Sequence, residues 1–456
     1  MPITRTILKG VAINSFSTPL VKLIGLVSVF LILSHLKVSE YGTVELAISL
    51  TSLLGIFMVP GLSSLVLADA SVEKSKGDLS RARAILFSSF TLHMTLGALA
   101  WSLTFFGADF FARFYGLSSD NVRLVSFLFL FSPFQSIYNT IFMVHLRFFE
   151  QSLMAIIGEV GKLCLLFILL FFFQMGVDGA LYSIVFSQLL TVVLFAPKSV
   201  QLFHKLRDGT RASSVPWVNL LKGRGMWSIL TSYMGNVGSA ARLWIIRRFL
   251  GEEAVGLYAL ASGLMGHTIA LASLSNVLTP LLPQYVHDRY KFIRLVTKGI
   301  EYQILAYIGF GIGAFFIFPP ILGWIFPNYV EAFPLFKIML LGLIPGAIVV
   351  VVTPAFFAMK MQKDLFISMS FKTLLTIVIS YMAVMYIGLM GLAYESILVA
   401  SFQAYERSRR LRKSLGNVNL FRRNFSSFDE DDRIIVKEIS QALNRVFTFV
   451  APFSKK

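Results

Sequence analysis

The sequence predicts an all-α polytopic membrane protein of about twelve transmembrane helices, and three observations lead to this class. The 456 residues are 56% hydrophobic and only 14% charged, with a mean hydropathy of +0.73, whereas soluble chains are about 25% charged. Apolar runs of about 20 residues, each able to cross a hydrocarbon core of about 30 Å, recur from end to end. Lipid offers no partner to an unpaired peptide group, so these runs must be helices. An internal repeat, described below, divides them into two six-helix bundles.

The expected spans of the first half are residues 10–35, 41–68, 84–107, 123–145, 152–173 and 178–197. Those of the second half are residues 226–249, 255–283, 299–323, 333–358, 365–387 and 391–406. The first apolar segment is longer than a signal-peptide core and has no cleavage pattern after it, so we interpret it as a retained span. Pro60-Gly61 in span two, and Pro280 and Pro283 in span eight, predict kinks.

Basic residues predict the orientation independently of hydropathy, because short cytoplasmic loops retain Lys and Arg. With a cytoplasmic N-terminus, the inner loops before the C-terminal tail carry nineteen basic residues, and the outer loops carry two, Lys37 and Arg113. Both termini are therefore expected in the cytoplasm. Most of the net charge of +17 is explained by this topology, so binding to nucleic acid is not needed to explain the high pI.

Two short sequence matches indicate the repeat. Gly42-Thr-Val-Glu-Leu-Ala after span one matches Gly256-Leu-Tyr-Ala-Leu-Ala after span seven, at an offset of 214 residues. Residues 176–182 and 388–394 share the pattern G-x-x-G-x-x-Y, at an offset of 212. Six spans per half give both halves the same orientation, with a substrate path expected in a central cavity between them.

The repeat predicts four regions. They are an N-terminal six-helix bundle (1–204), a basic cytoplasmic linker (205–225), a C-terminal six-helix bundle (226–406) and a basic cytoplasmic tail (407–456). The basic start of the tail is expected to meet anionic membrane lipids. Farther on, Ser427 is a candidate N-cap for a short amphipathic helix, which is expected to pack on the membrane, on the protein's own loops or on a partner protein.

No soluble-type catalytic, nucleotide-binding or metal-binding motif is present. Gly161-Lys162 lacks the upstream spacing of a phosphate-binding loop, and no HExxH pattern occurs. The sole cysteine, Cys164, lies within a span and is interpreted as an apolar filler. We therefore expect neither ATP hydrolysis nor a cofactor.

Ionisable residues inside spans are costly, so they usually face a partner or a wet cavity. Lys22 lies near the middle of span one, and Arg242 lies in span seven, its counterpart in the repeat. One interpretation is interhelical pairing with an acid such as Glu45 or Glu395. The other is that Lys22 and Arg242 face each other across the two halves and hold a substrate phosphate between them. Lys372 in span eleven is a weaker candidate.

Other polar residues complete the candidate site. Individual amides in spans more often hydrogen-bond between helices than bind a ligand, but several could line a hydrated cavity: Asn14, Asn139, Asn236 and Asn276. Glu159 and Lys162 have the spacing of an ion pair on one helix, and that pair is about equally well explained as structural. Glu159 and His267 are also the candidates for ion coupling.

The segment RLWIIRRFLGEEAVGLYALA at residues 242–261, together with Ser39-Glu-Tyr-Gly42, resembles polysaccharide-biosynthesis flippases, the Wzx-type O-antigen and capsule exporters. The resemblance implies the fold of the multidrug/oligosaccharidyl-lipid/polysaccharide (MOP) superfamily, MATE-like, with two bundles around a central cavity. It implies an undecaprenyl-diphosphate-linked oligosaccharide as substrate, flipped across the bacterial inner membrane by alternating access. Polysaccharide polymerase or glycosyltransferases are implied as possible partners. Such families often carry an acid where this chain has Ala241, which weakens any carry-over of cation coupling to this position.

Two other functions compete with this one. A cation-coupled multidrug exporter of the same fold should carry acids in its cavity, whereas Lys22 and Arg242 are basic and favour an anionic substrate. A membrane enzyme acting on glycolipids usually needs a large periplasmic loop, and the longest outer loop here covers only residues 108 to 122.

Overall fold

A computed structural model describes residues 3–59, 61–206, 224–271 and 273–416, and all of its elements are helices. Side chains at residues 3–16, 64, 224, 276, 277, 280 and 284 lie outside this description. The predicted linker beyond residue 206 and the helix expected after Ser427 also lie outside it. Within the described ranges, ten helices are long and apolar enough to span a membrane. Counting the 47-residue one twice and adding α17 gives the twelve spans expected from the sequence.

The first half of the chain supplies spans one to six. These are α1 (Ile3–His35), α2 with η1 and α3 (Val38–Leu53, Leu54–Met58, Leu62–Ser75), α4 (Leu79–Phe106), α6 with α7 (Ser119–Ser126, Leu128–Val144), α8 with the π segment η2 (Phe148–Phe167, Ile168–Phe172) and α9 (Gly176–His204). A short helix, α5 (Ala108–Tyr115), lies between spans three and four.

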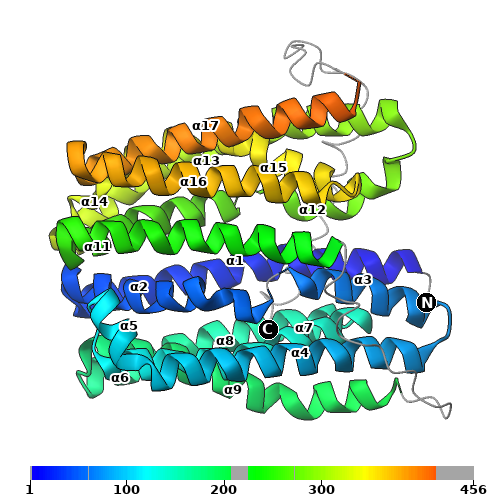
Figure 1. The fold of residues 1–456 in the computed structure, drawn as a ribbon, viewed down its shortest axis with the longest axis horizontal. Coiled ribbons are helices and arrows are strands. Elements are labelled where there is room, and N and C mark those ends of the chain that lie inside the picture. Colours follow the sequence, from blue (N-terminus) through cyan, green and yellow to red (C-terminus); the bar gives the residue numbers. More distant parts are fainter. Residues whose placement is uncertain (1–2, 60, 207–223, 272, 417–456) are drawn as a thin grey trace, which may run out of the picture.

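The second half supplies the other six. Spans seven and eight form α11 (Arg224–Leu271), continued by α12 (Ser275–Leu281) and η3 (Leu282–Tyr285). The remaining elements are α13 (Arg289–Ile325), η4 (Pro327–Tyr329), α14, η5 and α15 (Ala332–Met339, Leu340–Gly342, Leu343–Ala358), α16 (Gln362–Ile387) and α17 (Leu389–Ser414). Figure 1 shows the helices of the two halves as two groups, with α11 lying beside α1 and α2.

The chain turns between spans seven and eight at a single residue, Gly251. Its backbone angles, φ 88° and ψ −178°, belong to a region that only glycine adopts readily. Arg242 before the turn and Tyr258 after it are joined by a hydrogen bond of 2.9 Å. The two spans are therefore antiparallel neighbours that pack as a hairpin.

Spans two and eight are both interrupted near their middles, but only one break falls where proline predicted it. In span two the helix ends in η1, and Val59 and Gly61 both have left-handed backbone angles. In span eight the break lies between Leu271 and Ser275, whereas Pro280 lies inside α12 and Pro283 inside η3. The break expected at Pro280 and Pro283 therefore lies several residues earlier in the chain, and the two prolines lie on either side of the change from α12 to η3.

The helix starts of spans three and nine are capped in the same way. The carboxylate of Asp78 accepts the amide hydrogen of Arg81 at 2.8 Å, and that of Asp288 accepts the amide hydrogen of Lys291 at 3.2 Å. The bond from the Lys291 amide lowers the pKa of Asp288 below its ordinary value. Such caps satisfy amide groups that the first helical turn leaves without partners.

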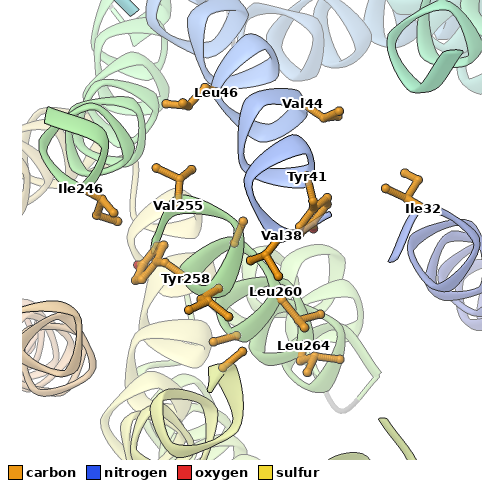
Figure 2. Packing of buried hydrophobic residues seen from close by; sticks show 14 of the residues in the cluster. Ile32, Val38, Tyr41, Val44, Leu46, Ile246, Val255, Tyr258, Leu260 and Leu264 are labelled. Carbon is orange, nitrogen blue, oxygen red and sulfur yellow. The ribbon is translucent and has the colours of Figure 1, made fainter. Parts of the chain in front are cut away.

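The two halves meet at a crossing of α2 with α11, at the two glycines of the sequence repeat. A Cβ atom placed on Gly42 would lie 2.1 Å from the carbonyl oxygen of Glu252, and one on Gly256 would lie 2.1 Å from that of Val38. Residues 38 and 42 are 214 positions before residues 252 and 256, so the two contacts are equivalent. Figure 2 shows Val38 of α2 close to α11, near Val255 and Leu260. The crossing therefore has approximate two-fold symmetry.

Further contacts join the halves around this crossing, and we call this part of the molecule the closed end. Tyr329 donates a hydrogen bond to the Leu36 carbonyl at 3.1 Å, and the Trp244 indole donates one to the Phe114 carbonyl at 3.1 Å. The Phe114 and Trp244 rings stack with centroids 5.1 Å apart. One buried apolar cluster runs through both halves here, from Leu46 and Leu50 to Val255 and Leu264.

Candidate functional site

The central ion pair of the second half joins Arg242 of α11 to Glu395 of α17. Their side chains approach to 2.9 Å, and the Glu395 side chain is fully buried. Arg242 also donates to the Tyr258 hydroxyl at 2.9 Å and, at a longer 3.5 Å, to the Ser380 hydroxyl. The pairing with Glu395 that the sequence left as an alternative is thus present in this structure. All three guanidinium nitrogens are engaged.

A cavity of about 330 Å³ opens beside this pair. We call it the Arg242 cavity, and its polar lining comes from α11, α16 and α17: Arg242, Tyr258, Ser262, Lys372, Ser396 and Gln403. The rest of its wall is apolar. Both residues of this lining that carry a charge at neutral pH, Arg242 and Lys372, are basic, so the cavity is suited to an anion.

Lys372 has no hydrogen bond or ion pair with any described residue. It lies within electrostatic range of Arg242, Arg407 and Glu395. Arg407 is 4% exposed and donates to Thr353 at 2.6 Å and Ser368 at 3.2 Å, which are uncharged groups. The basic run in the sequence predicted that Arg407 belongs to the tail, whereas α17 carries it into the bundle.

A second group of charges lies between the halves, and we call it the Lys22 cluster. It consists of Lys22 on α1, Glu159 and Lys162 on α8, and His267 on the second span of α11. The Glu159 and Lys162 side chains pair at 2.5 Å, and the charges of Lys22, Lys162 and Glu159 all act on His267. A Cβ atom on Gly25 would lie 3.7 Å from the Glu159 carboxylate and 3.9 Å from the His267 ring. The two predicted ion-coupling residues are therefore near neighbours.

No contact among the described residues joins Lys22 to Arg242. Lys22 is exposed, and its charge acts on His267 of the second half. Arg242 points into its own half, toward Glu395. In this conformation the two cations therefore belong to separate groups of residues, the Lys22 cluster and the Arg242 cavity.

The predicted asparagines are dispersed. Asn236 lies where α11 meets η1, its amide nitrogen 3.3 Å from the place of a Cβ atom on Gly55. Asn139 contacts Met143 of its own helix through a weak N–H···S contact of 3.9 Å. The side chains of Asn14 and Asn276 lie outside the described residues. Of the two asparagines whose side chains are described, Asn236 is the one at the interface between the halves.

An apolar cavity of about 450 Å³ lies between the second span of α11 and α13. Thr268 and Leu271 form one side, and Gly309, Phe310 and Gly313 contribute to the other. Met265 and Ile269 of the same span line the Arg242 cavity, so both cavities border the second span of α11.

Comparison with known proteins identifies the family and the fold. The profile of the family described as polysaccharide biosynthesis protein matches residues 35–326. A search of curated proteins found no match. Among solved structures, the lipid II flippase MurJ in an inward closed conformation is 16% identical, covers 96% of this chain and 98% of its own, and has a TM-score of 0.66.

A multidrug resistance MATE family transporter of the MOP superfamily is similar in two conformations. Both are 16% identical and cover 89% of this chain, with 98% of that chain covered in the inward-facing structure and 96% in the outward-facing one. The TM-score is 0.74 for the inward-facing conformation and 0.64 for the outward-facing one. These proteins are described as transporters or flippases, not as enzymes.

Proposed function

Since the chain belongs to the polysaccharide biosynthesis protein family and has the fold of MOP superfamily transporters, we propose that it is a lipid-linked oligosaccharide flippase. Its substrate is an oligosaccharide on undecaprenyl diphosphate, moved from the cytoplasmic to the periplasmic leaflet of the bacterial inner membrane by alternating access. The basic-residue bias of the loops supports cytoplasmic termini. With that orientation the closed end is periplasmic, so the described conformation loads from the cytoplasm.

The observation that carries the proposal is the charge of the Arg242 cavity. Arg242 and Lys372 line it, and Lys22 adds a third cation between the halves. A pocket for cationic drugs needs the opposite charge, so this lining favours an anionic headgroup over the exporter alternative. The apolar cavity beside α13 gives the lipid part of an amphiphilic substrate a neighbouring surface of matching character.

Transport is proposed to depend on Lys22 and Arg242 contacting the diphosphate, with Lys372 and Asn236 nearby in the substrate path. Since the two cations occupy separate sites in this conformation, the diphosphate meets them at different stages of the rocking of the halves. Glu159 and His267 are the proposed ion-coupling pair, because they come from opposite halves and lie within reach of each other. The two six-helix bundles predicted from the repeat, residues 1–204 and 226–406, are the parts proposed to move relative to each other.

The decisive experiment reconstitutes the protein in liposomes with a fluorescent polyprenyl-diphosphate oligosaccharide and measures its movement between leaflets. Wild-type protein should flip the probe. Arg242→Lys should retain part of the rate, because charge remains but the bidentate fork is lost, and Arg242→Ala and Lys22→Ala should lose it. A protein that transports a cationic dye but not this probe would be the multidrug exporter. Normal flipping by both alanine variants at normal abundance would refute the diphosphate contact.

A further inference from the structure

We propose that Glu395 holds Arg242 in its cavity until a ligand phosphate displaces the carboxylate, and that Lys372 is the cation that the phosphate meets first. This inference deepens the proposed function, because it names the group of the protein that the substrate's phosphate must displace. It rests on that function only for the statement that the phosphate belongs to a lipid-linked diphosphate.

Charge around the cavity is not balanced. Arg242 and Arg407 both lie within electrostatic range of Lys372, and Glu395 is the acid that reaches Lys372. Glu406 is the acid that reaches Arg407, but its carboxylate pairs with Arg410. Positive charge therefore exceeds negative charge within the described part of the second half. Since buried charge without compensation is strongly unfavourable, the excess calls for an anion.

Glu395 uses only one of its two carboxylate oxygens in hydrogen bonds with the described residues. One of its oxygens accepts from Arg242, while the other, Oε2, is buried and has no hydrogen-bond partner among the described residues. A carboxylate that accepts through only one oxygen competes weakly with a phosphate for the guanidinium group of Arg242. Phosphate oxygens can take two parallel hydrogen bonds from the same fork, with more negative charge behind them.

Lys372 is the cation of the cavity lining that has no hydrogen bond or ion pair with a described residue. Arg242 donates from all three of its nitrogens, to Glu395, Tyr258 and Ser380. The hydroxyls of Ser262 and Ser396 donate to carbonyl oxygens of their own helices. An arriving phosphate would therefore first meet Lys372, and would reach Arg242 by replacing Glu395. A cavity of about 330 Å³ has room for such a headgroup.

The test measures phosphate binding without transport. Purified full-length protein in detergent is titrated with inorganic pyrophosphate, with farnesyl diphosphate and with chloride at matched ionic strength, and binding is followed by calorimetry and by the unfolding temperature. Wild-type protein should bind both diphosphates and not chloride. Lys372→Met should weaken diphosphate binding by about ten- to a hundredfold, as expected for a lost charge-assisted contact. Glu395→Gln should strengthen it, because Arg242 is released.

Lys337→Met is the matched control, because Lys337 lies over the Phe315 ring, outside the cavity lining. It should bind as wild type does. Lys372→Met removes an unpaired side chain and is expected to fold, so its result stands even where Glu395→Gln lowers abundance. Tighter binding of farnesyl diphosphate than of pyrophosphate assigns the phosphate to a lipid, and equal binding assigns it to a free anion.

Three results would overturn the site. They are unchanged pyrophosphate binding by Lys372→Met, no diphosphate binding by wild type, and equal protection by chloride. Flipping of the lipid-linked probe alongside any of these would leave the proposed function standing. Diphosphate binding with the expected mutational pattern, but no flipping, would sustain the site and refute the flippase.

Discussion

At the scale of single residues, the Arg242–Glu395 pair governs both stability and charge in the second half. The Glu395 side chain is fully buried, and removing one partner of a buried pair typically costs about 3–5 kcal/mol, because the other charge is left alone. Arg242→Gln and Glu395→Gln should therefore each lower the unfolding temperature. The double variant should recover much of this stability, because no lone charge remains. Thermal unfolding of all four proteins measures the coupling, and strictly additive losses would contradict it.

A second prediction at this scale concerns His267 and the pH dependence of transport. If Glu159 and His267 couple ion movement, Glu159→Gln and His267→Gln should each flatten the pH profile of flipping between about pH 5 and 8, where histidine titrates. His93→Gln serves as the control, because the His93 ring hydrogen-bonds to the Ser89 carbonyl of its own helix at 2.7 Å. Flipping assays at several pH values in reconstituted liposomes test this. A wild-type pH profile in both variants would remove them from coupling.

Most of these residues could be identified from the sequence, but their interaction partners could not. Lys22, Arg242, Lys372, Glu159 and His267 stood out because charged groups are rare inside spans. Which acid meets which cation depends on tertiary packing, so pairing with Glu395 could be named only as one option. The buried position of Arg407 was missed, because a basic run after the last apolar stretch is typical of a cytoplasmic tail. Tyr258 and Gln403 carry no charge and gave no signal that separates them from ordinary interhelical groups.

At the scale of secondary-structure elements, the crossing of α2 and α11 controls closure of the halves. A side chain at Gly42 or Gly256 would lie 2.1 Å from a carbonyl oxygen, where contacts below 3.0 Å essentially never occur. Gly42→Ala and Gly256→Ala should therefore move the two halves apart at the closed end. Overpacking of about 1–3 kcal/mol shifts a two-state population by roughly five- to a hundredfold. Spin labels at Asp120 and Glu331 should report longer distances.

Alanine at Gly263 and Gly266 provides the control for this experiment. Both positions lie on the same helix as Gly256, and a Cβ atom at either would meet nothing within 4 Å. These variants should keep the wild-type distance distribution. The double variant Gly42→Ala/Gly256→Ala should open the closed end little more than either single one, because both act on one crossing. Unchanged distances in the single variants would show that the crossing does not hold the closed end.

The turn at Gly251 gives a prediction of a different kind. No atom lies within 4 Å of a Cβ atom placed there, but φ is 88°, so substitution by alanine is penalised by backbone conformation alone. Gly251→Ala should destabilise the protein by about 1–3 kcal/mol, as expected for a residue held in this region. The unfolding temperature measures the loss. A substitution that leaves it unchanged would mean that the hairpin of spans seven and eight tolerates another turn.

The elements themselves were largely predictable, because twelve apolar segments must become helices in lipid. Predicted and observed spans coincide to within several residues at most ends. One feature escaped prediction. The break in span eight precedes Pro280 and Pro283, which instead lie on either side of the change from α12 to η3.

At the scale of the whole molecule, the topology is the property to test. Single cysteines at Lys76 and Lys291, in a Cys164→Ser background, should resist labelling by a membrane-impermeant reagent added from the periplasm. Cysteines at Ser118 and Asp120 should be labelled. The reason is the bias of basic residues toward the loops at residues 76 and 291. Labelling with the opposite pattern would place the closed end in the cytoplasm and reverse the proposed direction of loading.

The reciprocal contact of Gly42 and Gly256 also has a meaning for ancestry. In a two-fold homodimer, residue i of one copy meets residue j of the other, and j meets i. Here Val38 meets Gly256 while Glu252 meets Gly42, so one covalent chain reproduces the contact of an isologous dimer. A half-length ancestor with one such glycine could have closed against a second copy of itself. Gene fusion would then have added only the connection, and the two halves became free to acquire different charges.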